Sequence, residues 1–139
     1  MKHLMILLAL MIGLTACAAD AQKKEEASKD GVEVLYFHGK QRCATCQAIE
    51  KETKAIIDSQ FADAVKSGKV RFRIVDITKA ENEALADKYE ITWSSLVIVK
   101  YDNGKETSEN LTKFAFANAR SNPAQFKKEL AAKINRLLN

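Results

Sequence analysis

The sequence predicts an α/β fold, with a central mixed β-sheet of about four strands flanked by helices. Three observations predict it. Short apolar runs rich in β-branched residues recur at residues 32–37, 70–75 and 96–99, with lengths typical of strands. Segments with helical periodicity follow them, most clearly at residues 47–57 and 122–138. A C-x-x-C motif lies between the first strand and the first helix.

Length and charge limit the classes of function. With 139 residues, the chain has room for one domain plus appendages. Its net charge of +4 is modest, and lysines and arginines are interleaved with aspartates and glutamates. This pattern argues against a nucleic-acid partner. Three cysteines are too few for a disulfide-stapled scaffold, so each is expected to have an individual role. We expect a monomer without a cofactor or a bound metal.

The N-terminus has the pattern of a secretion signal. A short basic start precedes an apolar run at residues 4–14, which is too short to be a stable transmembrane helix. Residues 14–17 read Leu-Thr-Ala-Cys and resemble the lipobox of bacterial lipoproteins. The resemblance implies a signal peptide at residues 1–16, acylation of Cys17 and a place in the bacterial cell envelope. Ala18 after the cysteine is compatible with the outer membrane. The alternative is an ordinary secretory signal with an incidental cysteine.

Residues 17–30 are expected to form a tether between the membrane and the domain. Charged pairs such as Lys23-Lys24 and Glu25-Glu26 alternate there with small residues, so the segment can bury little apolar surface. A frayed helix is the other interpretation. The folded domain is then predicted to span residues 31–139.

The first half of the domain predicts a strand and a long helix. Residues 32–37 lack strict alternation, which is typical of a central strand covered on both faces. The helix after the cysteines is expected to end or bend near Asp58-Ser59. Phe61 and Val65 then continue its buried stripe to a stop at Ser67-Gly68.

The second half predicts two more strands, a hairpin and a terminal helix. Residues 70–75 form a strand, 80–89 a short helix, and 96–99 another apolar strand. Asn103-Gly104 signals a hairpin turn before a polar edge strand near residues 107–112.

Residues 113–121 are compatible with a helical turn or a loop. Asn122 and Pro123 suit the start of the last helix, as N-cap and first-turn residue. The buried face of that helix is predicted to contain Phe126, Leu130 and Ile134.

The C-x-x-C motif carries the chemistry. Cys43 and Cys46 lie three residues apart at a helix start, close enough for a disulfide once the first sits in the opening turn. Unpaired N–H groups and the helix dipole there favour a thiolate over a thiol. Lys40 and Arg42 add positive charge, and all these effects lower the expected pKa of Cys43. The pattern indicates dithiol–disulfide chemistry.

Two further side chains are candidate proton carriers. His38, at the end of the first strand, is a candidate proton acceptor, and Glu50, one turn after Cys46, is a candidate relay. Ordinary alternatives exist for both: a polar residue at a strand end and a solvated helix face. Lys40 and Arg42 can likewise be simple loop charges.

The order of elements resembles the thioredoxin fold across about residues 31–139. More narrowly, Tyr36-Phe37-His38-Gly39 leading into the C-x-x-C motif resembles small thioredoxin-like envelope proteins known as nitrophenyl compound nitroreductase subunits. The resemblance implies a three-layer sandwich. It also implies that Cys43 is the exposed nucleophile and Cys46 the buried resolving thiol.

The sequence departs from the family pattern at four places. Arg42 stands where an aromatic residue usually precedes the first cysteine, and Ala44-Thr45 replaces the usual Gly-Pro. The family's buried acid aligns near Tyr36. The loop expected to face the cysteines contains Trp93, Ser94 and Ser95 but no proline, since Pro123 is the chain's only one. A cis bond at serine costs about 3 kcal/mol, so we expect this loop to be trans.

Three functional hypotheses follow. The first is a lipid-anchored thiol–disulfide oxidoreductase of the cell envelope, acting on protein thiols and disulfides through Cys43 and Cys46. The second is a metal-binding or electron-transfer module, because two thiolates make half of a tetrahedral site and a dimer would supply four. The third is a redox-inert adaptor with a vestigial disulfide. The motif on this predicted fold favours the first.

Overall fold

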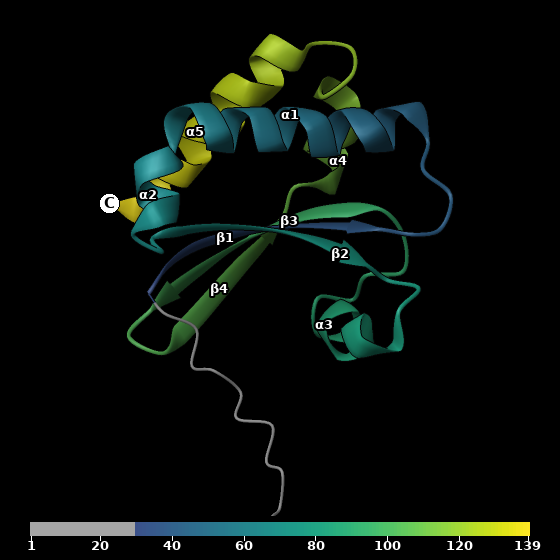
Figure 1. Ribbon diagram of the computed structural model, residues 1–139, viewed down its shortest axis with the longest axis horizontal. Coiled ribbons are helices and arrows are strands. Elements are labelled where there is room, and N and C mark those ends of the chain that lie inside the picture. Colours follow the sequence, from purple (N-terminus) through teal and green to yellow (C-terminus); the bar gives the residue numbers. More distant parts are fainter. Residues whose placement is uncertain (1–29) are drawn as a thin grey trace, which may run out of the picture.

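A computed structural model describes residues 30–139 (Figure 1). The predicted signal peptide, Cys17 and residues 17–29 of the predicted tether lie outside the described residues. A four-stranded sheet with the order β2-β1-β3-β4 forms the middle of the domain. Its strands are β1 (Gly31–His38), β2 (Val70–Asp76), β3 (Ser95–Asp102) and β4 (Lys105–Asn110).

The sheet is mixed, as predicted. β1 pairs in parallel with β2 and antiparallel with β3, and β3 pairs antiparallel with β4. The turn between β3 and β4 contains Asn103 and Gly104, both with positive φ, which is the geometry that this dipeptide favours in a tight hairpin. Because β1 has a partner on each side, it is the central strand that its continuous apolar run predicts.

Helices cover the two faces of the sheet unequally (Figure 1). One face carries α1 (Ala44–Gln60), α2 (Ala62–Lys66), α4 (Thr112–Asn118) and α5 (Pro123–Leu138). The opposite face carries a short 3-10 turn, η1 (Ala80–Asn82), and α3 (Glu83–Lys88). The result is a thioredoxin-like three-layer sandwich, so the predicted fold class is confirmed. Among residues 30–139, no helix combines the length and apolarity needed to cross a bilayer.

Each face of the sheet has its own hydrophobic core. Alternate residues of β1 point to opposite sides, so Val34 and Tyr36 face α1 and α5 while Leu35 and Phe37 face α3. The larger core includes the predicted buried face of α5, with Phe126, Leu130 and Ile134 at 0% exposure. Asn122 caps α5 by accepting a hydrogen bond from the N–H of Gln125 at 3.2 Å.

The start of β1 requires glycine. Gly31 has a φ of +139°, and a Cβ added there would lie 2.4 Å from the carbonyl oxygen of Lys69. The adjacent N–H of Val32 donates to that same oxygen at 2.8 Å. Only a residue without a side chain lets the two chain segments approach this closely.

Two details of the helical layers differ from the expectation. The helix after the cysteines does break, at Phe61, which is buried as predicted. Val65, however, is 43% exposed, so the predicted buried stripe does not continue to it. The reason is that α2 is a separate five-residue helix with no buried residue, and it starts in a new direction after Phe61.

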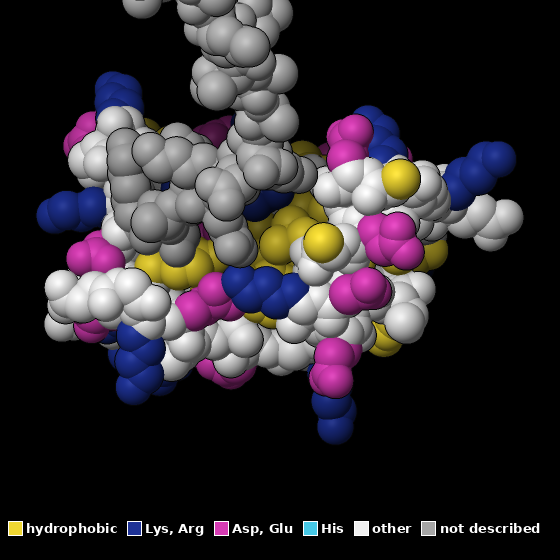
Figure 2. Space-filling view, turned by 90° about the horizontal axis from the view of Figure 1, so that it is seen from below, with side chains coloured by type: hydrophobic (Ala, Val, Ile, Leu, Met, Phe, Trp, Pro, Cys, Tyr) yellow, Lys and Arg dark blue, Asp and Glu magenta, His cyan; other side chains and the backbone are white. Residues whose placement is uncertain are grey.

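The polar edge strand also lies earlier than expected. β4 ends at Asn110, and Thr112 already begins α4. This helix occupies most of residues 113–121, for which a helical turn or a loop was the expectation. The surface itself mixes charges as the sequence predicts, since acidic and basic side chains are interleaved on the face shown in Figure 2.

A carboxylate is buried beneath the sheet on the α3 side, which the sequence did not reveal. Glu33 is 6% exposed, accepts a hydrogen bond from the hydroxyl of Tyr101 at 3.1 Å and lies 3.5 Å from Arg73. Nearby, the hydroxyl of Tyr89 donates to Glu106 at 2.8 Å. Burial raises the pKa of both Tyr89 and Tyr101, so these phenols remain neutral donors that fasten α3 to the sheet.

Candidate functional site

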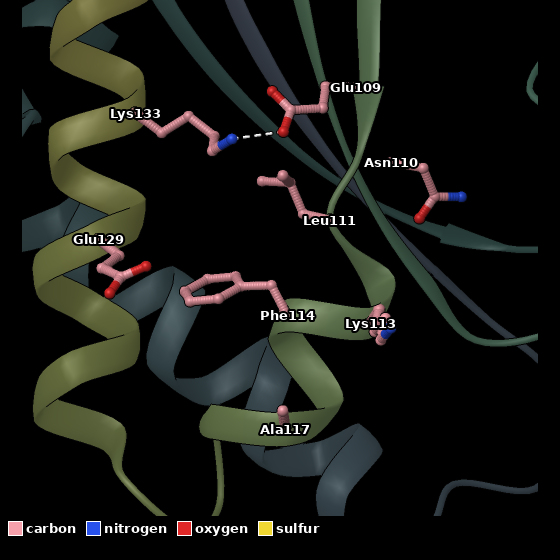
Figure 3. A pocket seen from close by; sticks show the side chains of 8 residues that line it. All are labelled: Glu109, Asn110, Leu111, Lys113, Phe114, Ala117, Glu129 and Lys133. Atoms are coloured by element: carbon pink, nitrogen blue, oxygen red, sulfur yellow. Dashed lines mark hydrogen bonds and ion pairs between the residues drawn. The ribbon is translucent and has the colours of Figure 1, made fainter.

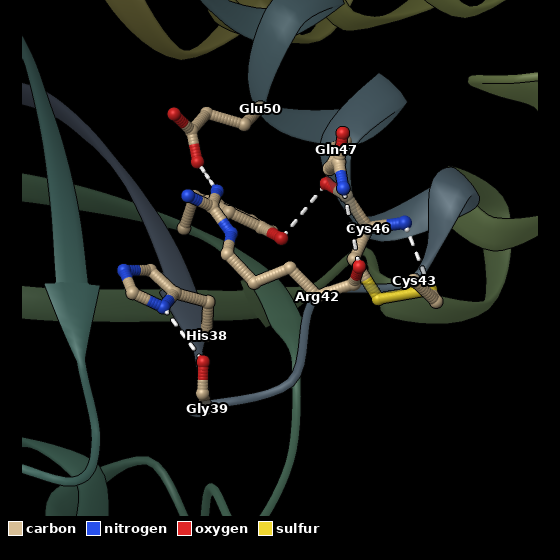
Figure 4. Close-up of a disulfide and its surroundings, with 8 residues drawn as sticks. His38, Gly39, Arg42, Cys43, Cys46, Gln47 and Glu50 are labelled. Carbon is tan, nitrogen blue, oxygen red and sulfur yellow. Dashed lines mark hydrogen bonds and ion pairs between the residues drawn. A yellow bond between two sulfur atoms is a disulfide. The ribbon is translucent and has the colours of Figure 1, made fainter.

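The candidate site is built on the first turn of α1. Cys43 is the N-cap of this helix, with extended backbone angles, and its sulfur accepts a hydrogen bond from the N–H of Cys46 at 3.0 Å. The two cysteines form a disulfide, with their Cα atoms 5.0 Å apart (Figure 4). The sulfur of Cys43 therefore lies among the unpaired N–H groups of a helix N-terminus, which stabilise a thiolate when the bond is reduced.

The two sulfurs differ in accessibility. Cys43 is exposed, whereas Cys46 is 5% exposed and faces the interior on the same side of α1 as Ile49. A thiolate or disulfide from solution can therefore reach Cys43 first. The roles of attacking and resolving cysteine, which the family resemblance implies, stay a prediction.

Tyr36 supports the first turn of α1 from below. Its side chain is fully buried, and its hydroxyl donates to the carbonyl oxygen of Cys46 at 2.8 Å. The Ser94 hydroxyl interacts with the same phenol. Burial raises the pKa of Tyr36, although Arg42 and Ser94 oppose this effect. The position where the family places a buried acid thus holds a neutral hydrogen-bond donor.

Arg42 points toward the body of the domain. Its guanidinium carbon lies 5.9 Å from the centre of the Tyr36 ring, and the group forms an ion pair with Glu50 of α1. Figure 4 shows the side chain extending away from the disulfide to the Glu50 carboxylate. The sequence placed the charge of Arg42 beside Cys43. The structure instead shows it engaged with an acid eight residues later, whose spacing gave no signal of this contact.

The structure places His38 beside Tyr36 and leaves Lys40 on the surface. The half-buried His38 ring stacks against Tyr36 with centroids 6.1 Å apart, and its Nδ1 lies 3.0 Å from the carbonyl oxygen of Gly39. Figure 4 shows the His38 ring turned toward Gly39. Lys40 is exposed in the loop before α1.

The loop before β3 reaches the site through Ser94. Phe37 of β1 pairs with Ser95 of β3 in the sheet, so this loop and the C-terminal end of β1 lie at the same end of the two strands. Ser94 is 8% exposed and contacts Tyr36, whereas Trp93 is 56% exposed and packs against Phe116 of α4 with ring centroids 5.2 Å apart. The described peptide bonds are all trans, as expected for a loop without proline.

The rest of the described domain was considered for a metal site and for a cavity near the cysteines. Residues 30–139 contain no cluster of three or more histidine, cysteine or acidic side chains that could hold a metal ion. A cavity of about 490 Å³ lies between α4, α5 and the end of β4 (Figure 3). Leu111 and Phe114 form its apolar wall, and an ion pair between Lys133 and Glu109 crosses its rim. Neither cysteine lines this cavity.

No family model matches the sequence, and no curated protein sequence matches it. Trxlp from Edwardsiella tarda EIB202 is similar in structure, with 15% identity and a TM-score of 0.48 over 75% of this chain and 85% of that one. A thioredoxin from Thermus thermophilus has 16% identity and a TM-score of 0.45 over 73% of this chain and 72% of that one.

The chain is thioredoxin-like in fold. The sheet order and the two helix layers carry this assignment. The Trx4 domain of ERdj5 is a further similar structure, with 19% identity and a TM-score of 0.45 over 73% of this chain and 81% of that one. The narrower resemblances, to nitroreductase subunits and to lipoproteins, find no counterpart among these structures.

Proposed function

We propose that the chain is a thiol–disulfide oxidoreductase whose reacting groups are Cys43 and Cys46. One observation carries the proposal. The exposed Cys43 is the N-cap of α1, and its sulfur is bonded to that of the buried Cys46. This places an accessible sulfur where its thiolate is stabilised and a second sulfur within bonding distance of it. A thioredoxin-like fold with such a pair is suited to redox chemistry on other proteins.

The reaction consists of two exchange steps. In the reducing direction, the Cys43 thiolate attacks one sulfur of a partner disulfide, forms a mixed disulfide and releases the other partner sulfur as a thiolate, which takes a proton. Cys46 then loses its proton and attacks the Cys43 sulfur, which releases the second partner thiol. Two electrons have passed from the cysteine pair to the partner, and the Cys43–Cys46 disulfide remains. The oxidising direction is the reverse.

Equilibration with glutathione tests the function. The purified domain should pass completely and reversibly between dithiol and disulfide as the ratio of reduced to oxidised glutathione changes. Thiol counting after acid quenching should show two thiols appearing in a single two-electron transition. A pair that stays oxidised across the accessible range of glutathione ratios, or that reacts only after unfolding, would contradict the proposal.

We further propose that the protein acts at the bacterial cell envelope, anchored by acyl chains on Cys17, and exchanges disulfides with envelope proteins. The lipobox-like residues 14–17 and the preceding apolar run support this location. Ala18 after the cysteine is compatible with the outer membrane. The charged segment up to residue 30 would then hold the domain away from the lipid surface.

Mass spectrometry of the mature chain checks this location. In a bacterial host, we expect the N-terminal peptide to begin at Cys17 and to carry acyl groups, with the protein in the membrane fraction. Cys17→Ser should abolish the modification. Soluble protein with an unmodified N-terminus at another residue would show that the signal is an ordinary secretory one.

A further inference from the structure

The ion pair between Arg42 and Glu50 lies next to the cysteine pair and has no role in the two exchange steps. Arg42 directly precedes Cys43, and a cation at that place generally stabilises the thiolate. The backbone of Arg42 is fastened to α1, because the side-chain amide of Gln47 donates to its carbonyl oxygen at 3.2 Å. The backbone of Arg42 is thus held in place, and only its side chain is free to change direction.

Two contacts hold that side chain away from the disulfide. The guanidinium pairs with Glu50, lies over the ring of Tyr36 and is only partly exposed, at 31%. Its Nε atom is buried and has no hydrogen-bond partner within residues 30–139. A buried donor without a partner is unfavourable, so the attraction to Glu50 must outweigh it. Glu50 is also only partly exposed, at 25%, so water screens the pair less than a fully exposed one.

We propose that Glu50 is a positioning residue that withholds the charge of Arg42 from Cys43. With Glu50 ionised, the pair is neutral and points into the domain. Without it, the guanidinium loses its partner and swings on its flexible stem toward solvent and the Cys43 sulfur. Glu50 thereby makes the cysteine pair more reducing than a C-x-x-C motif preceded by an unpaired arginine. This inference rests on the proposed exchange function and deepens it.

The expected effect follows from the charge that is released. A thiolate stabilised by a nearby cation favours the reduced dithiol, so the disulfide becomes a stronger oxidant. A unit charge several ångströms from the sulfur in a mostly aqueous setting stabilises the thiolate only modestly. We therefore expect Glu50→Gln to shift the equilibrium with glutathione about threefold toward the dithiol, which is roughly 15 mV for two electrons. The Cys43 thiol should also titrate at a lower pH.

Four variants test the inference: Glu50→Gln, Arg42→Gln, the double variant and Asp58→Asn. Each is equilibrated with glutathione, and the absorbance of its thiolate is followed against pH. Asp58→Asn is the matched control, because it removes one negative charge from the exposed far end of α1, where Asp58 pairs with Lys54. It should leave the equilibrium unchanged. Thermal unfolding confirms that each variant is folded at the temperature of measurement.

The double variant distinguishes positioning from a direct charge effect. If Glu50 acts through Arg42, the shift caused by Glu50→Gln should largely vanish when Arg42 is already Gln. An equal shift in both backgrounds would mean that Glu50 acts through its own charge and would overturn the proposal, as would no shift at all. Wild-type protein that fails to equilibrate with glutathione would instead contradict the proposed function.

Discussion

Cys46→Ser is expected to accumulate covalent complexes with partner proteins, whereas Cys43→Ser is expected to form none and to lose disulfide exchange completely. The structure gives the reason. Cys43 is exposed at the start of α1, and Cys46 is 5% exposed behind it. When Ser replaces Cys46, Cys43 still attacks, but nothing resolves the mixed disulfide. When Ser replaces Cys43, the remaining thiol is buried and is out of reach of a protein disulfide.

Non-reducing electrophoresis of cell extracts measures the trapping. Bands of higher mass should appear with Cys46→Ser and collapse on reduction. The double variant Cys43→Ser, Cys46→Ser is the control for background pairing. Trapping of equal extent by both single variants would contradict the assignment of roles, and the reverse pattern would make Cys46 the attacking residue.

Phe126→Ala should lower the free energy of unfolding by about 4 kcal/mol, the range typical of a fully buried phenylalanine. Phe126 is 0% exposed in the core between the sheet and α5, and its ring stacks on Phe114 with centroids 5.5 Å apart. Alanine would remove the ring from both contacts and leave a cavity that a helix already packed against α1 and the sheet fills only in part.

Urea unfolding followed by circular dichroism measures this loss. Val65→Ala serves as the control, since Val65 is 43% exposed on α2 and its truncation should change the free energy of unfolding by less than about 1 kcal/mol. The slope of the free energy against urea should stay the same in both variants. A loss below about 1 kcal/mol for Phe126→Ala would show that α5 contributes little to the cooperative unit.

The sequence predicts correctly those strands, turns and helix starts that depend only on residues close to them in the chain. The apolar run at residues 34–37 of β1, the Asn103-Gly104 turn and the capped start of α5 each follow from neighbouring residues alone. The position of Cys43 at a helix N-terminus belongs to the same group. The prediction is less accurate where the burial of a residue depends on the direction in which the chain continues after a helix break. Val65 continued a helical stripe in the sequence, but the break at Phe61 turned it outward.

Long-range contacts between polar side chains could not be predicted. Glu33 reads as one charge in an apolar strand, and its burial depends on Tyr101, which is 68 residues away. The pairing of Arg42 with Glu50 depends on the conformation of the loop that joins β1 to α1. A charged side chain satisfies the same sequence pattern whether it faces solvent or a partner, so only the assembled fold distinguishes the two.

The direction of β1 determines how the domain can be attached to a surface. The disulfide follows the C-terminal end of this eight-residue strand, and that end lies roughly 23 Å from the strand's start at the usual rise per residue. At the start, Asp30 accepts a hydrogen bond from the N–H of Asn103 at 2.8 Å, and Asp30, Gly31 and Asn139 line one shallow hollow. Both ends of the described chain thus lie on the side remote from Cys43. A bead, a sensor chip or a fused protein joined at either end would leave the reactive sulfur facing outward.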